Sequence, residues 1–198
     1  MTENPMSLPT PEAYQPSNPL ATLAMFDEQE LEVDLEAAYG GQGTQLITFL
    51  LGEERYGVEI VKIRELISFP ETITPIPGMP KYVAGMINLR GLVIPVVDLR
   101  LRFEMPAGEY HRFTVVIIVQ IAQKCIGIIV DSVSDVIFLE DEHLQEIQED
   151  STNIDSEFLK GVACVREEMV ILLDVERLFS PEELGRIARH GTTLVEGN

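Results

Sequence analysis

The side chains most able to do chemistry are three histidines, two cysteines and two aspartates. His111, His143 and His190 are far apart in the sequence, and none has another histidine, cysteine or carboxylate at a metal-ligand spacing. Isolated surface histidines are therefore expected, with no metal site and no cofactor. The sequence also lacks the motifs of serine hydrolases, phosphate-binding loops, kinases and zinc proteases.

The cysteines and aspartates have structural interpretations. Cys125 and Cys164 each lie in an apolar, strand-like segment without a CxxC pattern, so we expect two buried small side chains. Asp98 and Asp174 could form a paired-carboxylate catalytic site. Each, however, follows an apolar run and opens a short helical segment, where an aspartate accepts hydrogen bonds from exposed N–H groups. Capping is favoured, no catalytic residue is assigned, and an enzyme is not expected.

Composition excludes further classes of function. The 198 residues carry 33 acidic and 14 Lys or Arg side chains, a net charge of -19, which opposes binding to nucleic acid or to anionic lipid headgroups. The longest apolar run, Val115–Val119, is far shorter than the roughly 20 residues that cross a bilayer. The first basic side chain is Arg55, so a secretory signal is not predicted, and we expect a cytoplasmic protein without membrane insertion.

Residues 1–43 differ from the rest of the chain. They contain eight acidic and no basic side chains, several prolines and the glycine-rich segment 40–43, a composition that offers no apolar core. We predict a disordered acidic extension over residues 1–43. Leu31 and Leu35 could share one face of a short helix, but a solvated acidic segment is the favoured alternative.

From Thr44 onward the sequence predicts a mainly β protein, because short runs rich in Val, Ile and aromatic residues alternate with turn residues. The predicted strands are 45–51, 56–60, 92–97, 113–121, 125–130, 136–139 and 169–173. Helical spacing predicts short helical segments around Ile60, Ile63 and Ile67, over 98–103 and over 174–179. A C-terminal helix should begin at Ser180 and Pro181 and end at Gly191.

An internal repeat is the most informative feature. Residues 82–103 match residues 158–179 at a constant offset of 76, which pairs Gly85 with Gly161, Arg90 with Arg166 and Asp98 with Asp174. Upstream, residues 48–66 match residues 118–136 at an offset of 70. One unit used twice predicts two similar small β lobes that complete each other's burial.

Four segments in sequence order carry a resemblance to a known family: YGVEIVKIREL, MPKYVAGMINLRGLVIPVVDLR, GIIVDSVSDV and MVILLDVERLF. The sequence resembles the CheW family, the coupling proteins of bacterial chemotaxis, over about residues 44–180. The resemblance implies two intertwined five-stranded SH3-like barrels and leaves 181–198 as a C-terminal helix and tail. It also implies a non-catalytic adaptor that couples chemoreceptor cytoplasmic tips to the regulatory domain of a CheA-type histidine kinase, in the cytoplasm at receptor arrays.

The resemblance also implies where the partners bind. The receptor-binding groove falls on seven positions: Ile60, Ile63, Glu65, Gly85, Arg90, Val133 and Val136. Val93 is the implied kinase-binding position. Each aliphatic residue could equally be part of the core. Arg90 needs a carboxylate, carbonyl groups or solvent, and its structural alternative is an ion pair with Glu65 or Asp98.

Two alternatives stay open. The first is an adaptor of a related chemosensory pathway that controls surface motility of the pilus type. The acidic extension and the segment Ser68-Phe69-Pro70, where a more polar link is common in the family, leave the particular pathway undecided. The second is a small β-barrel enzyme, which would require catalytic residues clustered in one pocket.

Overall fold

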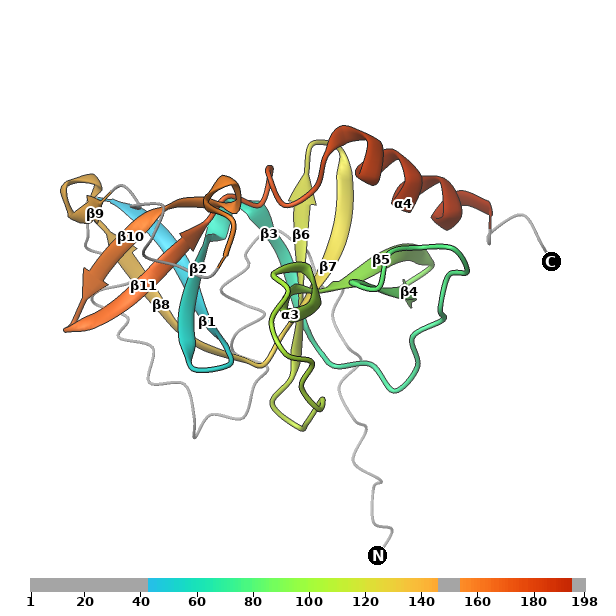
Figure 1. Ribbon diagram of the computed structural model, residues 1–198, viewed down its shortest axis with the longest axis horizontal. Coiled ribbons are helices and arrows are strands. Elements are labelled where there is room, and N and C mark those ends of the chain that lie inside the picture. Colours follow the sequence, from blue (N-terminus) through green and yellow to red (C-terminus); the bar gives the residue numbers. More distant parts are fainter. Residues whose placement is uncertain (1–42, 146–153, 194–198) are drawn as a thin grey trace, which may run out of the picture.

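The computed structural model describes residues 43–145 and 154–193 of the chain (Figure 1). The predicted disordered extension, apart from Gly43, and the residues after Thr193 lie outside this part. Two lobes built from strands lie side by side, and the main C-terminal helix lies over one of them (Figure 1). No helix among the described residues is long and apolar enough to cross a membrane.

We name each lobe after one of its strands. The β1 lobe is a sheet with the strand order β8-β1-β2-β11-β10-β9, and the β6 lobe has the order β3-β6-β7-β5-β4. The strands of the β1 lobe are β1 (Thr44–Leu51), β2 (Glu54–Glu59), β8 (Ser132–Leu139), β9 (Leu144–Gln145), β10 (Leu159–Val165) and β11 (Glu168–Leu173). Those of the β6 lobe are β3 (Ile63–Ser68), β4 (Val83–Leu89), β5 (Leu92–Asp98), β6 (Val115–Ile121) and β7 (Lys124–Val130).

The two lobes exchange strands. The first repeat places β1 and β2 in one sheet and then crosses to supply β3, β4 and β5 to the other. The second repeat does the reverse, because β6 and β7 lie in the β6 lobe whereas β8, β10 and β11 return to the β1 lobe. Without the two-residue strand β9, both sheets have five strands in equivalent order. The prediction of two intertwined lobes is therefore confirmed.

Glycines mark the equivalent junctions where the two repeats pair. The parallel strands β11 and β2 place Leu172 opposite Gly57, and the parallel strands β5 and β7 place Val96 opposite Gly127. Both pairs follow the offsets of 76 and 70 read from the sequence. A Cβ on Gly127 would lie 2.7 Å from Cγ1 of Val116, so the second junction has no room for a side chain.

The apolar runs are continuous because many strands bury both faces. In β6, Ile117 belongs to a large core shared by the lobes, whereas its neighbour Ile118 belongs to a smaller core inside the β6 lobe. The β1 lobe has its own smaller core around Leu46 and Leu172. A strand buried on both faces loses the alternation of polar and apolar residues, which explains the uninterrupted run Val115–Val119.

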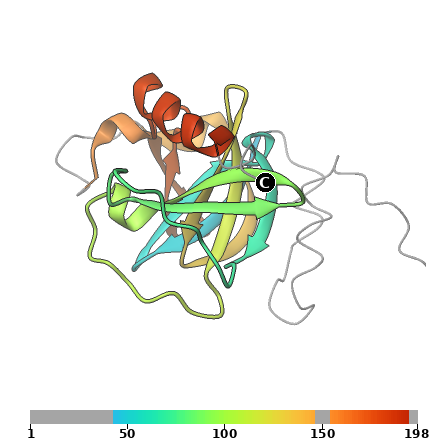
Figure 2. The same cartoon turned by 90° about the vertical axis from the view of Figure 1, so that its right-hand side faces the viewer.

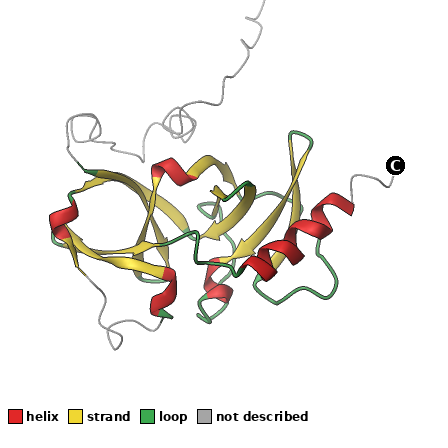
Figure 3. Ribbon diagram, turned by 90° about the horizontal axis from the view of Figure 1, so that it is seen from above, coloured by secondary structure: helices red, strands yellow, loops and turns green. Residues whose placement is uncertain are grey.

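Short helices occupy the junctions between strands (Figure 3). They are η1 (Ile60–Lys62), α3 (Leu99–Arg102), η2 (Asp141–His143) and η3 (Ser156–Phe158). The helical prediction around Ile60, Ile63 and Ile67 is wrong beyond Lys62, because residues 63–68 form strand β3. The segment 98–103 is helical as predicted, but 174–179 forms only a turn, closed by the bond from Arg177 N–H to the Asp174 carbonyl at 3.0 Å.

The C-terminal helix α4 (Pro181–Thr193) packs on β5 and lies along the β6 lobe (Figure 2). Its predicted start is confirmed, because the Ser180 N–H donates to the Glu183 carboxylate at 2.8 Å and the Glu183 N–H donates to Ser180 Oγ at 3.2 Å. The helix continues past Gly191, where the sequence predicted its end.

The two cysteines are less buried than predicted. Cys125 is half-buried in β7, and Cys164 is exposed in β10. In β10 the buried Ala163 precedes Cys164, and alternation along the strand turns the next side chain to solvent. The prediction of a buried Cys164 is therefore wrong.

Candidate protein-binding surface

Glu65 and Arg90 form the best-defined ion pair among the predicted site residues. Strand β3 supplies Glu65, and the tight turn between β4 and β5 supplies Arg90. The Arg90 Nη2 donates to Glu65 Oε1 at 2.6 Å and the Nη1 donates to Oε2 at 3.2 Å, so the contact is bidentate. The predicted structural ion pair is thus made with Glu65.

The backbone of the turn presents Arg90 at the surface. Arg90 and Gly91 have φ values of 51° and 88°, the positive values of a two-residue hairpin turn. The Gly91 N–H donates to Asn88 Oδ1 at 2.8 Å, which stabilises the turn. Of the paired side chains, Arg90 is 63% exposed and Glu65 only 15%. Glu65 therefore anchors a guanidinium that remains accessible to a partner.

The predicted aliphatic positions lie deeper than an open groove requires. Ile60, Ile63 and Val136 are each about one-twentieth exposed and belong to the shared core, and the half-buried Val133 packs against that core. The four side chains are thus part of, or packed against, the core shared by the lobes, and they come from η1, β3 and β8. Their direct contribution is to fix the backbone of the surface above them.

Val61 and Leu92 are the exposed apolar residues next to the predicted positions. Val61 in η1 is 82% exposed, and Leu92 beside the Arg90 turn is 64% exposed. The sequence reasoning missed both residues. The repeat offsets held a signal, because they align Val61 with Asp131 and Leu92 with Glu168, and a charged counterpart indicates a surface position.

Gly85 and Val93 complete the predicted set. The φ of Gly85 is 147°, and a Cβ there would lie 2.3 Å from the Thr74 carbonyl oxygen. Thr74 and Met86 exchange two backbone hydrogen bonds at this point, so Gly85 is needed for close packing of the 74 segment on β4. Val93 is half-buried in β5, next to the more exposed Leu92.

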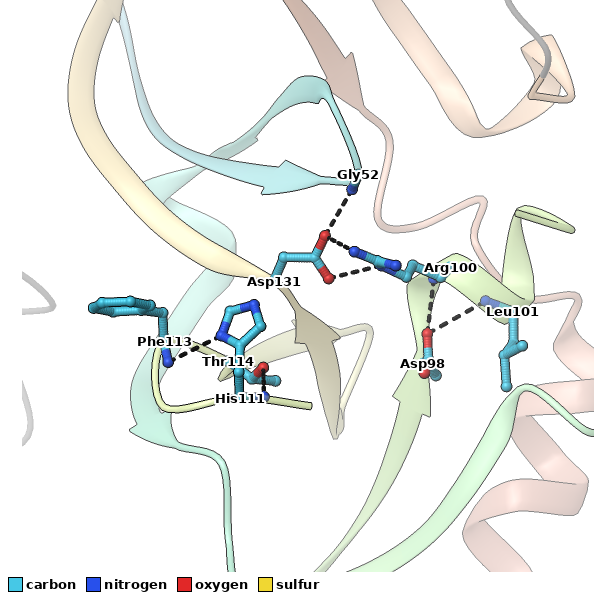
Figure 4. Close-up of polar contacts among 8 residues, drawn as sticks. All are labelled: Gly52, Asp98, Arg100, Leu101, His111, Phe113, Thr114 and Asp131. Carbon is cyan, nitrogen blue, oxygen red and sulfur yellow. Dashed lines mark hydrogen bonds and ion pairs between the residues drawn. The ribbon is translucent and has the colours of Figure 1, made fainter. Parts of the chain in front are cut away.

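The two aspartates have capping roles. The Asp98 carboxylate accepts hydrogen bonds from the N–H groups of Arg100 and Leu101 (Figure 4). It also accepts a hydrogen bond from the Tyr110 hydroxyl at 2.7 Å. Burial of the hydroxyl, and then its bond to Asp98, raise the pKa of Tyr110. Asp174 accepts from the Glu176 N–H at 3.1 Å. The capping interpretation is therefore confirmed for Asp98 and, at a turn, for Asp174.

Asp131 joins the two lobes beside this cap. Its carboxylate accepts from the Gly52 N–H in the β1–β2 turn at 2.6 Å and from Arg100 Nε at 2.7 Å (Figure 4). Lys62 and Glu176 form a second link between the lobes at 2.7 Å. Glu176 is the repeat counterpart of Arg100. Lys62 is one residue after Val61, the counterpart of Asp131, so the two links lie at nearly equivalent places with the charges exchanged. The carboxylates of Asp131 and Glu176 therefore have a structural role in joining the two lobes.

The described residues contain no cluster of three His, Cys, Asp or Glu side chains able to hold a metal ion. His111 and His143 are exposed, as expected, whereas the side chain of His190 is not among those described. The accessible chemistry of the candidate site is therefore a charged fork with apolar neighbours. Such a surface suits recognition of another protein.

Comparisons with known proteins give this surface a family context. The sequence pattern of the CheW-like domain matches residues 45–183. The chain belongs to the CheW family. It is 37% identical over 145 residues to the chemotaxis protein CheW of Klebsiella aerogenes, which covers 73% of this chain and 87% of that protein. It is 35% identical over 149 residues to the chemotaxis protein CheW of Treponema pallidum, covering 73% of this chain and 86% of that protein.

A solved structure extends the likeness to the CheW-like fold. The crystal structure of the scaffolding protein TtCheW from Thermoanaerobacter tengcongensis aligns with a TM-score of 0.67 at 32% identity. The alignment covers 73% of this chain and 93% of that protein. The mainly β architecture of two SH3-like barrels, expected from the resemblance, is confirmed.

Proposed function

We propose that the protein is a non-catalytic adaptor that couples the cytoplasmic tips of chemoreceptors to a CheA-type histidine kinase in chemotaxis. Membership of the CheW family over most of the chain is the observation that carries the proposal. Two lobes that share one core provide a single body with separate surfaces for two partners. The proposal places the protein in the cytoplasm, at receptor arrays.

The receptor-binding surface, in this proposal, is centred on Arg90 and Glu65. A receptor tip is a helical hairpin, and a bidentate fork beside an exposed aliphatic side chain can bind a helix through one charged and one apolar contact. Val61 joins the predicted set as the exposed apolar residue. Ile60, Ile63, Gly85, Val133 and Val136 support the surface from below, because their side chains or packing are internal.

The kinase-binding surface is assigned to the start of β5. Val93 was the predicted position, and the adjacent Leu92 exposes more of its side chain. An exposed leucine at the end of a hairpin is a suitable anchor for another small β barrel.

An adaptor of a chemosensory pathway that controls surface motility would also need one surface for a receptor and one for a kinase. Isolation of the protein from cells with its bound receptors would separate the two pathways. A β-barrel enzyme is not favoured, because Asp98 and Asp174 act as caps and Asp131 links the two lobes.

Reconstitution tests the coupling role. Purified protein, receptor fragment and histidine kinase are mixed, and kinase phosphorylation is measured against adaptor concentration. The proposal expects phosphorylation to rise with adaptor only when the receptor fragment is present. Stimulation without receptor, or none with it at saturating adaptor, contradicts coupling.

A further inference from the structure

An aromatic patch lies on the β6 lobe, at the loop that leads into β6. We define the aromatic patch as Phe69, Tyr110, His111, Arg112 and Phe113. The rings of Phe69 and Tyr110 lie with their centroids 4.3 Å apart, and those of His111 and Phe113 lie 5.9 Å apart. The Arg112 guanidinium lies 4.5 Å from the centre of the Phe113 ring. The described residues thus gather four rings and one cation on one loop and the end of β3.

The patch is open to a ligand. Tyr110 is 46% exposed and Phe113 is 43% exposed, two of the few large apolar residues at the described surface. In Figure 4 the Phe113 ring extends away from the Asp98 and Arg100 side chains. Clustered Tyr, Phe and Arg side chains are the groups that contribute most to protein interfaces. None of these residues belongs to the proposed receptor or kinase surface.

Charge distinguishes the lobe that carries the patch. Residues 60–130, which form the β6 lobe, contain five acidic and eight basic side chains. Residues 131–145 and 154–180, which form most of the β1 lobe, contain eleven acidic and three basic side chains. An acidic segment is therefore repelled by the β1 lobe and attracted by the β6 lobe.

The chain itself supplies a segment of matching chemistry before Gly43. Residues 20–28 read LATLAMFDE, an apolar run that ends in Phe26 and is followed directly by two carboxylates. Methionine and phenylalanine pack well against aromatic rings, and a carboxylate next to them can pair with a guanidinium. The order of apolar and acidic groups in this segment matches the rings of the patch and Arg112.

The connecting chain is long enough for the contact. Phe26 is 17 residues before Gly43, the first described residue, and such a chain reaches about 60 Å when extended. A compact domain of this size has a diameter of roughly 40 Å, so a chain of this length can reach most of its surface. A short linker also keeps the segment at a high effective concentration near the patch. An extension without a core of its own can still bury single side chains on another surface.

We infer that residues 20–28 bind the aromatic patch of the same chain, with apolar side chains on the Tyr110 and Phe113 rings and carboxylates beside Arg112. The extension is then a built-in ligand of the β6 lobe. Any other acidic, apolar segment that uses this patch must displace it. This inference goes beyond the coupling role and does not depend on it.

Photo-crosslinking in the full chain tests the inference. Phe113 is replaced by p-benzoyl-phenylalanine, and after irradiation the protein is digested with trypsin. The first basic side chain is Arg55, so the extension and strand β1 stay in one peptide, residues 1–55, and fragmentation locates the link within it. We expect the link in residues 20–28. A second variant with the same probe at Met169, which is 63% exposed on the β1 lobe, is the matched control.

We expect at least a fivefold higher yield of this link from position 113 than from position 169. Adding Arg112→Glu to the position-113 variant should lower the yield by at least threefold. Equal yields from both positions, or no link to 20–28 from position 113, overturn the inference. A mixture of isotopically light and heavy protein identifies links between chains, and mainly mixed products would assign the patch to a second copy and also overturn it. Circular dichroism confirms that each variant is folded.

Discussion

Arg102 donates a hydrogen bond from its Nε to the carbonyl oxygen of Leu178, at 2.8 Å, and Leu178 is the counterpart of Arg102 in the second repeat. The bond therefore lies where the two repeats meet. Around it, the ring pair of Phe103 and Phe158 at 5.9 Å is the counterpart of the pair of Phe179 and Tyr82 at 6.4 Å. The approximate twofold axis that relates the two repeats thus passes near this contact.

Replacing Arg102 should destabilise the junction between the lobes. Its guanidinium lies 4.5 Å from the Phe158 ring centre and 5.0 Å from that of Tyr82, and its side chain is only 17% exposed. Arg102→Met keeps most of the apolar stem but removes the cation and the donor. We expect a loss of about 2 kcal/mol in the free energy of unfolding, measured with urea.

Arg177→Met is the control for this change, because the Arg177 side chain is 66% exposed and its ion pair is with the nearby Asp174. Its expected cost is below about 0.5 kcal/mol. Equal losses for the two variants would show that the Arg102 contacts contribute nothing specific.

Asp98 and Asp174, which are counterparts in the two repeats, should contribute differently to the free energy of unfolding. Asp98→Ala removes the acceptor of two helix N–H groups and of the Tyr110 hydroxyl in a buried site, so we expect a cost of about 3 kcal/mol. Asp174→Ala removes one backbone bond at a half-buried turn and should cost about 1 kcal/mol. Thermal and urea unfolding measure both.

Coupling activity in the reconstituted system distinguishes capping from chemistry at Asp174. The capping role expects activity to remain in Asp174→Ala. Full stability together with complete loss of coupling in this variant would contradict the capping role.

The repeat was the part of the fold that the sequence could predict, because the aligned pairs reappear as equivalent places in the two lobes. Gly57 with Gly127 and Asp98 with Asp174 are examples. The exchange of strands could not be read from one repeat alone. Residues on opposite sides of a crossover, such as those of β2 and β3, follow one another in sequence but pair in different sheets.

Strand β3 shows why a local pattern misled. The register against β6 shifts between Ile63 and Glu65, so an extra residue is inserted into the strand. Ile63 and Leu66 then both face the core, three residues apart, and the pattern imitates a helix. The sequence predicted, as one alternative, an ion pair of Arg90 with Glu65 or Asp98, because a charged side chain in an apolar strand-turn context needs a polar partner or solvent, and the pair forms with Glu65.

The contact between α4 and the β6 lobe should weaken at acid pH. The Glu183 carboxylate is partly buried, which alone would raise its pKa, but hydrogen bonds from Tyr82 and from Ser180 and the charge of Arg102 hold the pKa below its usual value. A lowered folded-state pKa contributes stability that is complete above the unfolded pKa of about 4.3 and is lost as the pH falls through the folded value.

We therefore expect the stability of the wild-type protein to fall more steeply below about pH 4.3 than that of Glu183→Gln. Glutamine keeps an acceptor for the Ser180 N–H but does not titrate. Urea unfolding at a series of pH values measures the difference. Parallel curves for the two proteins would show that Glu183 does not link protonation to folding.

Arg90→Ala should separate folding from the proposed coupling. The Arg90 side chain is 63% exposed, so loss of its pair with Glu65 should cost no more than about 1 kcal/mol of folding free energy. Alanine and arginine meet the same backbone strain at the positive φ of this position, so the turn itself is not further penalised. The thermal transition should shift by only a few degrees.

Binding should suffer far more than folding. Loss of an arginine at the centre of an interface costs about 2 kcal/mol, or roughly thirtyfold in affinity. We expect Arg90→Ala to abolish stimulation of the kinase at adaptor concentrations that saturate the response to the wild type. Pull-down with receptor fragment and with kinase separately identifies which partner is lost, and the proposal names the receptor.

Arg166→Ala is an internal control, because Arg166 has the same place in the second repeat and the same φ of 51°. The surroundings differ: Asp135, the counterpart of Glu65, pairs with Arg55 at 3.3 Å. Arg166→Ala should therefore leave receptor binding within about threefold of wild type. Equal damage from both changes would mean that the two lobes share the receptor surface. Unfolding of Arg90→Ala would instead assign Arg90 a structural role, because only the fold would then depend on its pair with Glu65.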